Sequence, residues 1–539
     1  MIFGGDAGKA AFVSHQWLAK EHPDPDCQQI CVLQGALTRL MRGQGSVPLD
    51  FVTEAVTTAK ALPMKAFQTK LFLWYDYFSV PQEVRDDGSQ AKAINSIPGY
   101  VAKCHFFMAL CPFLESKSEA QVLSALSWGR RGWCRLERAA RELSAEPAWI
   151  LVQDEASMEL VGTAFSFGSG CLGEGDFTVE EDRQALAPVM RNILLQKLQN
   201  CLRTKDIPGF RRQLNLQGVH LRGLQVEPVQ GLLQSLHLDA VAEFLHQNGF
   251  RKACEVDRAG WQALHYAAMA GNCKVLQGLL EVRANVNKRT LKDVPSLGYP
   301  PEASALDLTL FYRHHEATRL LLQARASLEG GTAPAIQWAA QGDNAEGIRL
   351  LCAARANPLA KDYTGDTPLQ SAAGLSATRA LEELVTQSRP SERDLSLALF
   401  DATSFRGGSV QLVLRLLDLR ADINFQHTTS ELSRTGQMLL ASMTFRHRLG
   451  ITSMGSTFAY HMKGSTPLMQ AIQSGQYEAA AALLAAGAKV ELKNSRQWTA
   501  KDFAKRKSIP DFLQLGLDGD TSECQRVCSL AEHYIEEAM

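Results

Sequence analysis

The sequence lacks the features that mark a secreted or membrane-embedded protein. No run approaches the ~20 consecutive apolar residues that a membrane-spanning helix needs, and Met1–Asp6 contains no cationic segment leading into an apolar stretch. There are 12 cysteines, but the pairs Cys27/Cys31 and Cys524/Cys528 do not have the CxxC spacing of a zinc site. We therefore expect a cytoplasmic protein with reduced thiols and no bound metal.

The chain also lacks an excess of charge of either sign. It carries 56 lysines and arginines against 57 acidic residues. This balance gives no overall field that would attract nucleic acid or an anionic membrane surface. With 539 residues, 45% of them hydrophobic, the chain is long enough for two or more globular domains. We expect no nucleic-acid partner, no membrane insertion and no cofactor.

One pattern recurs through the C-terminal half of the sequence. It is clearest in Asp257–Gly271, and it returns in Gly365–Ala373 and Gly464–Ile472. Equivalent positions such as Pro467 and Ala500 are 33 residues apart. This period, with a Thr-Pro-Leu start, an Ala-rich first helix and a Leu-Leu pair in the second, resembles the ankyrin-repeat family. The resemblance implies an all-α solenoid that binds another protein.

The pattern has physical reasons that can be followed in these residues. The hydroxyls of Thr367 and Thr466 are suited to cap a helix, and Pro368 and Pro467 stand where a helix tolerates proline. No single repeat buries its own apolar face, so stability comes from stacking on neighbours. We expect repeats over 257–516, with insertions at 290–302 and 430–463, preceded by a helical connector and degenerate capping repeat over 206–256 and followed by a helical tail over 517–539.

The first 205 residues show a different pattern, in which short apolar runs alternate with segments of helical periodicity. This alternation favours an α/β domain with a doubly wound, mostly parallel sheet. Expected strands lie at 10–13, 70–74, 105–110 and 148–152, and expected helices at 27–42, 51–62, 91–104 and 133–144.

Polar and aromatic side chains follow these expected strands and begin the last expected helix. In a parallel sheet, ligands bind at the carboxyl ends of the strands, so we expect one pocket there. The residues are Ser14, His15 and Trp17 after the first strand; Trp74, Asp76, Ser79 and Gln82 after the second; and Arg131, Trp133 and Glu137 at the helix start.

In this order, the residues resemble the heterokaryon-incompatibility (HET) domain and the related TIR domain. The HET pattern joins Ser-Tyr/His-x-Trp, Trp-x-Asp-x-x-Cys/Ser-x-x-Gln and Arg-x-Trp-x-x-x-Glu, and TIR domains share the Trp-Cys-x-x-Glu form of the last element. A helix with a tyrosine, here Tyr100, also falls where HET domains carry one. Two positions depart from the HET pattern: Leu18 replaces a glycine and Leu136 replaces a glutamine. The resemblance covers about a third of the chain.

The resemblance implies two different roles for this domain. It is a non-catalytic assembly module, capable of self-association, in a signalling protein whose repeats choose the partner. Alternatively it is a NAD glycohydrolase, in which Glu137 is the catalytic residue and stabilises the oxocarbenium-like ribose left when nicotinamide departs. In that case NAD is a substrate, and Ser14, His15, Trp17, Trp74, Asp76, Gln82 and Trp133 are the residues that would bind it.

Overall fold

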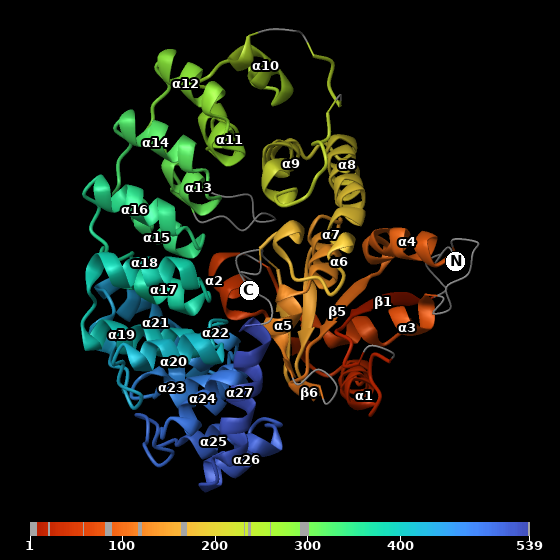
Figure 1. The fold of residues 1–539 in the computed structure, drawn as a ribbon, viewed down its shortest axis with the longest axis vertical. Coiled ribbons are helices and arrows are strands. Elements are labelled where there is room, and N and C mark those ends of the chain that lie inside the picture. Colours follow the sequence, from red (N-terminus) through yellow and green to blue (C-terminus); the bar gives the residue numbers. More distant parts are fainter. Residues whose placement is uncertain are drawn as a thin grey trace.

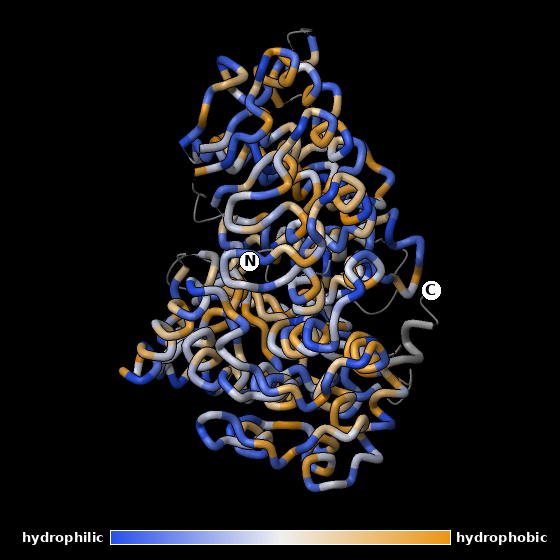
Figure 2. Tube along the Cα trace, turned by 90° about the vertical axis from the view of Figure 1, so that its left-hand side faces the viewer, coloured by the Kyte–Doolittle hydropathy of each residue, from blue (hydrophilic) through white to orange (hydrophobic). Residues whose placement is uncertain are grey.

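The structure is a computed structural model that describes residues 8–19, 22–57, 59–80, 89–116, 121–162, 170–230, 232–235, 239–258, 260–291 and 301–536. Figure 1 shows an N-terminal α/β domain and a curved array of paired helices that runs alongside it. Most of the expected insertion at 290–302, and Gln82, lie outside the described residues. Within the described part of the chain no helix is long and apolar enough to cross a membrane. Figure 2 shows hydrophobic and hydrophilic residues interspersed along the trace.

In the described part of the α/β domain, five strands form one mixed sheet in the order β4-β1-β5-β8-β9. The first four are parallel and fall on the apolar runs that predicted strands. β9 is antiparallel to β8 and was not predicted. The strands are β1 (Lys9–Ser14), β4 (Leu71–Tyr75), β5 (Phe106–Leu110), β8 (Trp149–Val152) and β9 (Met158–Val161). Two small antiparallel sheets are formed by β2 (Ser46–Val47) with β3 (Leu62–Pro63) and by β6 (Leu114–Ser116) with β7 (Gln121–Leu123).

Helices cover both faces of this sheet, because successive strand residues point to opposite sides. Phe12 and Phe107 belong to a core shared with α4, α6 and α8, whereas Val13 and Met108 pack against α1 and η1. The expected helix at 51–62 ends earlier, at Val56. The helices of this domain are α1 (Gln28–Met41), α2 (Phe51–Val56), η1 (Met64–Phe67), α3 (Asp76–Ser79), α4 (Ser89–Lys103), α5 (Ala125–Arg130), α6 (Gly132–Glu142), η3 (Leu172–Glu174), α7 (Glu181–Ala185) and α8 (Ala187–Arg203).

The connector joins the two parts through shared cores. Helix α9 (Ile207–His220) places Phe210 in the core of the α/β domain and Leu216 in the core of the helical array. It packs against both α8 and α11, while α10 (Ala240–Gln247) packs against α12. Together α9 and α10 therefore begin the array in the manner of a first repeat.

In the helical array, the first helix of each repeat packs on the first helix of the next repeat, and second helices pack on second helices in the same way. Thr367 caps α17 through the main-chain N–H of Gln370, and Thr466 caps α23 through that of Met469, as the Thr-Pro pattern predicts. The pairs are α11 (Ala263–Ala270) with α12 (Cys273–Glu281), α13 (Ala305–Phe311) with α14 (His315–Gln323), α15 (Ala335–Gln341) with α16 (Ala345–Ala353), α17 (Pro368–Gly374) with α18 (Thr378–Ser388), α19 (Glu392–Ser404) with α20 (Val410–Asp418), and α23 (Pro467–Ser474) with α24 (Tyr477–Ala485).

The insertion at 430–463 interrupts the sequence of the array but not its stacking, since α19 packs directly on α23. The inserted residues form η4 (Thr429–Glu431), α21 (Arg434–Arg448) and α22 (Met454–Met462), which pack on each other over Phe400 of α19. Beyond α24 the chain ends in α25 (Ala500–Ala504), α26 (Asp511–Asp518) and α27 (Ser522–Glu536). Helix α27 packs against α24 and against β7 of the α/β domain.

Candidate functional site

Five of the predicted site residues meet at the carboxyl ends of β1 and β4. We call this group, Ser14, His15, Trp17, Asp76 and Glu137, the strand-end cluster. β1 ends at Ser14, α3 begins at Asp76 directly after β4, and Glu137 lies in the second turn of α6. The parallel pairing of β1 with β4 sets the two strand ends side by side.

The buried half of the cluster is built around Glu137. The Ser14 hydroxyl donates a hydrogen bond of 2.6 Å to Glu137 Oε2, and Trp128 Nε1 donates one of 2.9 Å to Ser14 Oγ. Ser14 and Trp128 are buried, and Glu137 is 9% exposed. Three side chains from β1, α5 and α6 are thus linked in the interior.

The half of the cluster nearer to solvent is built around Asp76. Its two carboxylate oxygens lie 2.6 Å from His15 Nε2 and 2.9 Å from Trp17 Nε1. The His15 ring stacks on Tyr75, with ring centroids 4.1 Å apart. The Asp76 side chain is 28% exposed, whereas that of His15 is 1% exposed. A ligand approaching from solvent would therefore meet Asp76 and Trp17 first.

The remaining predicted site residues lie around the cluster and are not all part of it. Trp74 stacks between Phe12 and Tyr100. Trp133 donates a hydrogen bond of 3.0 Å to Asp182 on α7. Ser79 accepts a hydrogen bond from the main-chain N–H of Tyr75, and Arg131 precedes α6 at its N-cap position.

Two partners of the cluster were not predicted from the sequence. Tyr75 lies within the second motif segment and Trp128 lies three residues before Arg131, but an aromatic residue beside a buried strand or helix is usually part of a core. Only their positions in space show that Trp128 bonds Ser14 and that Tyr75 stacks on His15. Their closeness in sequence to Trp133 and Asp76 was the available signal.

The pKa values of the two carboxyl groups of the cluster are shifted in opposite directions. Burial raises the pKa of Glu137 to about 8, against a lowering effect of the Ser14 hydrogen bond and a further raising effect of the Asp76 charge. Burial also acts to raise the pKa of Asp76, but the hydrogen bonds and charge of His15 and the bond from Trp17 bring it below its usual value. At neutral pH the cluster therefore holds a protonated Glu137 near an ionised Asp76.

This arrangement is suited to holding a hydroxyl-bearing ligand by hydrogen bonds, and a carboxyl with a perturbed pKa is a common mark of a functional site. Among the described residues, no group of three His, Cys, Asp or Glu side chains is placed to hold a metal ion. The polar groups that the cluster offers nearest to solvent are the Asp76 carboxylate, the His15 imidazole and the Trp17 indole N–H.

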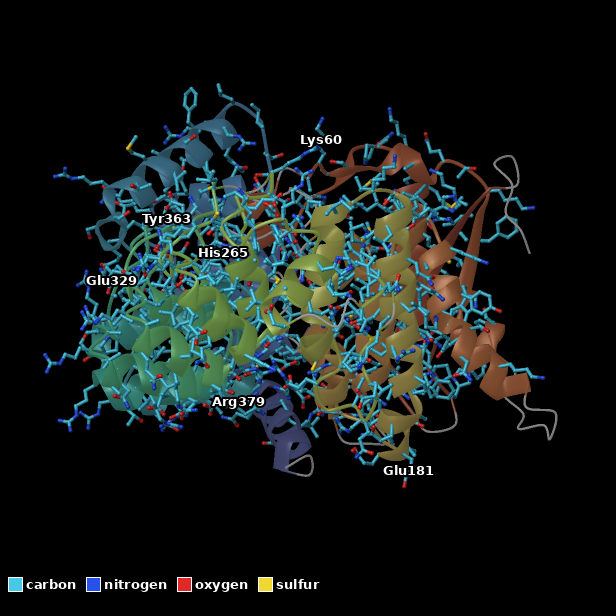
Figure 3. All side chains as sticks on the ribbon, turned by 90° about the horizontal axis from the view of Figure 1, so that it is seen from above. Lys60, Glu181, His265, Glu329, Tyr363 and Arg379 are labelled. Carbon is cyan, nitrogen blue, oxygen red and sulfur yellow. The ribbon has the colours of Figure 1, made fainter. Side chains whose placement is uncertain are left out.

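A second candidate surface is the boundary between the α/β domain and the repeats. Turns that join the two helices of a repeat contact the domain: Arg313 donates two hydrogen bonds of 2.7 Å to Glu174, and Arg406 pairs with Glu159 at 2.9 Å. Ser124 donates a bond of 2.5 Å to Glu478. In Figure 3 Glu329 and Tyr363, which lie in the loops between repeats, are on the side away from the domain.

The inserted helix α21 carries an exposed apolar stripe. Met438, Phe445 and Leu449, spaced by seven and four residues, are 74%, 62% and 61% exposed. Residues with this spacing share one face of a helix. Two arginines, Arg446 and Arg448, flank the stripe, and no acidic residue occurs between Glu431 and Glu478 in the sequence.

Comparison with known proteins identifies ankyrin repeats in two segments. The family model described as "Ankyrin repeats (many copies)" matches residues 236–280, and the "Ankyrin repeat" model matches residues 463–495. No curated protein matches the chain. Among solved structures, the crystal structure of the human ASB11 ankyrin repeat domain is similar, with 19% sequence identity and a TM-score of 0.34, over 48% of this chain and 98% of that one. The C-terminal part of the chain contains ankyrin repeats, a module associated with protein binding.

Proposed function

We propose that this chain is a signalling protein whose ankyrin repeats bind a partner protein, and that its HET/TIR-like, doubly wound domain is a non-catalytic module that the repeats position. The observation that carries the proposal is the exposed apolar stripe of α21 on the repeats. An isolated exposed apolar residue is ordinary, but a contiguous apolar face with a polar rim is typical of a protein-binding surface.

The α21 stripe is exposed although the α/β domain reaches the neighbouring inserted helix α22, where α2 packs and Glu54 accepts a hydrogen bond from the main-chain N–H of Gly455. The domain contacts the turns within repeats, through Glu174 with Arg313 and Glu159 with Arg406. The charge around the stripe is positive, so the partner segment we expect is a helix with apolar side chains flanked by Asp and Glu. This mode is the packing of an amphipathic helix onto an apolar surface.

The test is selection of binders from a displayed library of random helical peptides on the full-length chain. Selected peptides should combine apolar with acidic residues, and the double substitution Met438→Ser with Phe445→Ser should weaken their binding by more than about tenfold, as for buried interface residues. Leu515→Ser, at a 45% exposed leucine on α26, is the matched control and should leave binding unchanged. Equal binding to both variants, or the absence of any binder, would contradict the proposal.

A second candidate function is NAD glycohydrolysis with Glu137 as the catalytic residue. The observation that favours it is the raised pKa of Glu137, to about 8, within a cluster at strand ends. Ser14, His15, Trp17, Trp74, Asp76, Gln82 and Trp133 would then bind NAD. We rank this function second because the Glu137 carboxyl is buried and already bonded to Ser14, whereas a catalytic carboxylate must reach the ribose.

Nicotinamide release from NAD by the full-length chain tests this second candidate. If it holds, Glu137→Gln abolishes release, while Glu181→Gln, at an exposed acid on α7, leaves it intact. Release must be measured over a range of protein concentrations, because self-association of the domain would complete the site. No release at any concentration from a folded chain would remove the candidate.

A further inference from the structure

A cavity of about 610 Å³ lies between the α/β domain and the repeats. Its walls come from α5, α6, η3 and α9 on one side and from the turns within the repeats on the other, elements that face each other in Figure 1. This volume falls in the range of small-molecule sites. Glu137, Asp76 and Trp17 are not among its lining residues, so the cavity is separate from the strand-end cluster.

The charge of the cavity wall is strongly unbalanced. Among the described residues that line it, eight are arginines and four are carboxylic acids. Burial raises the pKa of two of those acids, Glu142 and Glu478, while Arg138 and Ser124 respectively act to lower it. One of the eight arginines, Arg406, pairs with Glu159 just outside the wall, and the other seven still outnumber the acids in a chain that is nearly neutral as a whole.

On the side of the α/β domain, arginines on α6 are held largely by neutral groups. Arg135 donates hydrogen bonds of 2.9 Å to the carbonyl oxygens of Gly129 and Cys171, and Arg138 donates one of 3.0 Å to that of Gly170. Burial, and then the charge of Arg138, lower the pKa of Arg135 to about 10. These bonds orient both guanidinium groups, and Arg138 also pairs with Glu142 at 3.6 Å.

Where the two walls meet, the carboxylate of Glu174 in η3 serves two arginines. Glu174 binds Arg313 at 2.7 Å and lies 3.8 Å from Arg222. Burial, and then the charge of Arg313, lower the pKa of Arg222. Arg379, at the start of α18, pairs at 2.9 Å with Asp343 in the turn between α15 and α16, and its side chain is 68% exposed. A second cavity, of about 380 Å³, shares these five residues.

Excess positive charge in a partly enclosed space is unfavourable unless an anion compensates it. Planar guanidinium groups that converge from several elements suit the oxygens of phosphate better than a single carboxylate. The wall also includes the partly buried Phe311 and Tyr312, which offer apolar surface to the organic part of a ligand. Charge, volume and lining therefore describe the same class of ligand.

We propose that this cavity is a binding site for a polyphosphorylated small molecule, which fixes the α/β domain against the ankyrin repeats. The ligand spans arginines of α5 and α6, Arg222 beyond the end of α9, and arginines in the turns of two repeats, so its binding couples elements that are distant in sequence. The proposal is independent of the function assigned to either part of the chain.

The test is calorimetric titration of the full-length chain with inorganic triphosphate. One equivalent should bind and raise the melting temperature, because a ligand specific to the folded state stabilises it. The double substitution Arg130→Gln with Arg379→Gln removes two arginines of the cavity wall, and the fold should tolerate it because Arg130 is partly buried and Arg379 is exposed. It should weaken triphosphate binding by more than about tenfold. Arg415→Gln, on the exposed face of α20, is the control and should bind like the unmodified chain.

ATP and inositol hexakisphosphate form the two further arms of the titration. Tighter binding of ATP than of triphosphate would assign the apolar wall to a nucleobase, and tighter binding of inositol hexakisphosphate would assign the site to a compact polyanion. Either result carries the proposal. Absence of triphosphate binding, equal binding to the double variant, or binding no tighter than that of sulfate would overturn it.

Hydrogen exchange of the unmodified chain gives a measurement that needs no variant. Triphosphate should slow exchange at α6 and at the turns around Arg313 and Asp343, which belong to opposite walls of the cavity. Protection confined to other surfaces would place the anion elsewhere and refute the assignment.

Discussion

Replacing Glu137 by glutamine is expected to change how the stability of the chain depends on pH. Glu137 is 9% exposed, and its pKa is raised from 4.5 to about 8, chiefly by burial. Between these two values the unfolded chain has released the proton and the folded chain still holds it. Folding then takes up a proton, so stability is full below pH 4.5 and falls as the pH rises towards 8.

The size of the effect follows from the shift in pKa. Each pH unit in this window costs about 1.4 kcal/mol of stability, which gives about 3 kcal/mol between pH 5.5 and 7.5. Glutamine has no proton to exchange, but its amide oxygen still accepts the bond from Ser14. Between pH 5.5 and 7.5 the free energy of unfolding of Glu137→Gln should therefore fall by about 3 kcal/mol less than that of the unmodified chain. The variant should be the more stable of the two proteins at pH 7.5.

Urea unfolding followed by tryptophan fluorescence measures the effect, since Trp128 bonds Ser14 in the same cluster. The difference between the two proteins isolates Glu137 from other buried acids that shift stability in the same direction. Glu181→Gln replaces an exposed acid and serves as the control. Equal slopes for Glu137→Gln and the unmodified chain would refute the reasoning, because they would mean that Glu137 is ionised in the folded protein.

Two further predictions concern the repeats and their boundary with the domain. His265 is fully buried, and burial lowers its pKa to about 4, so it contributes stability that is present above pH 6.5 and lost as the pH falls towards 4. Between these pH values the unmodified chain should lose up to about 3 kcal/mol more stability than His265→Asn, measured by thermal melting. An equal loss in the two proteins would contradict this prediction. A double-mutant cycle of Arg313→Gln and Glu174→Gln should give a coupling of about 1 kcal/mol in chemical unfolding, and additive effects would show that the pair does not hold the two parts together.

The elements of the fold that sequence predicts well are those with a strong local period. The runs that became β1, β4, β5 and β8 are almost entirely apolar, as buried parallel strands require. β9 was missed because it is short and includes Glu159, whose partner Arg406 is far away in sequence. The helix from Phe51 is shorter than its apolar pattern predicts, because Ala59 and Ala61 lie in irregular chain and Leu62 lies in β3.

The candidate site shows the same division between local and distant information. That Ser14 and Asp76 lie close together follows from their positions after two parallel strands. That Glu137 bonds Ser14 does not, because the approach of α6 depends on packing across the whole domain. The contacts between domain and repeats, such as Glu174 with Arg313, join residues 139 positions apart and leave no trace in sequence periodicity.

The α/β domain holds the ankyrin array at both of its ends. At the beginning, α9 belongs to the cores of both parts. At the end, α27 packs on β7, and Arg526 pairs with Glu115 at 2.7 Å. An open solenoid tolerates the gain or loss of a repeat, because each unit contacts only its neighbours. Here an added or deleted repeat would carry one end away from its anchor, so the number of repeats in this architecture is fixed by the span of the domain that they enclose.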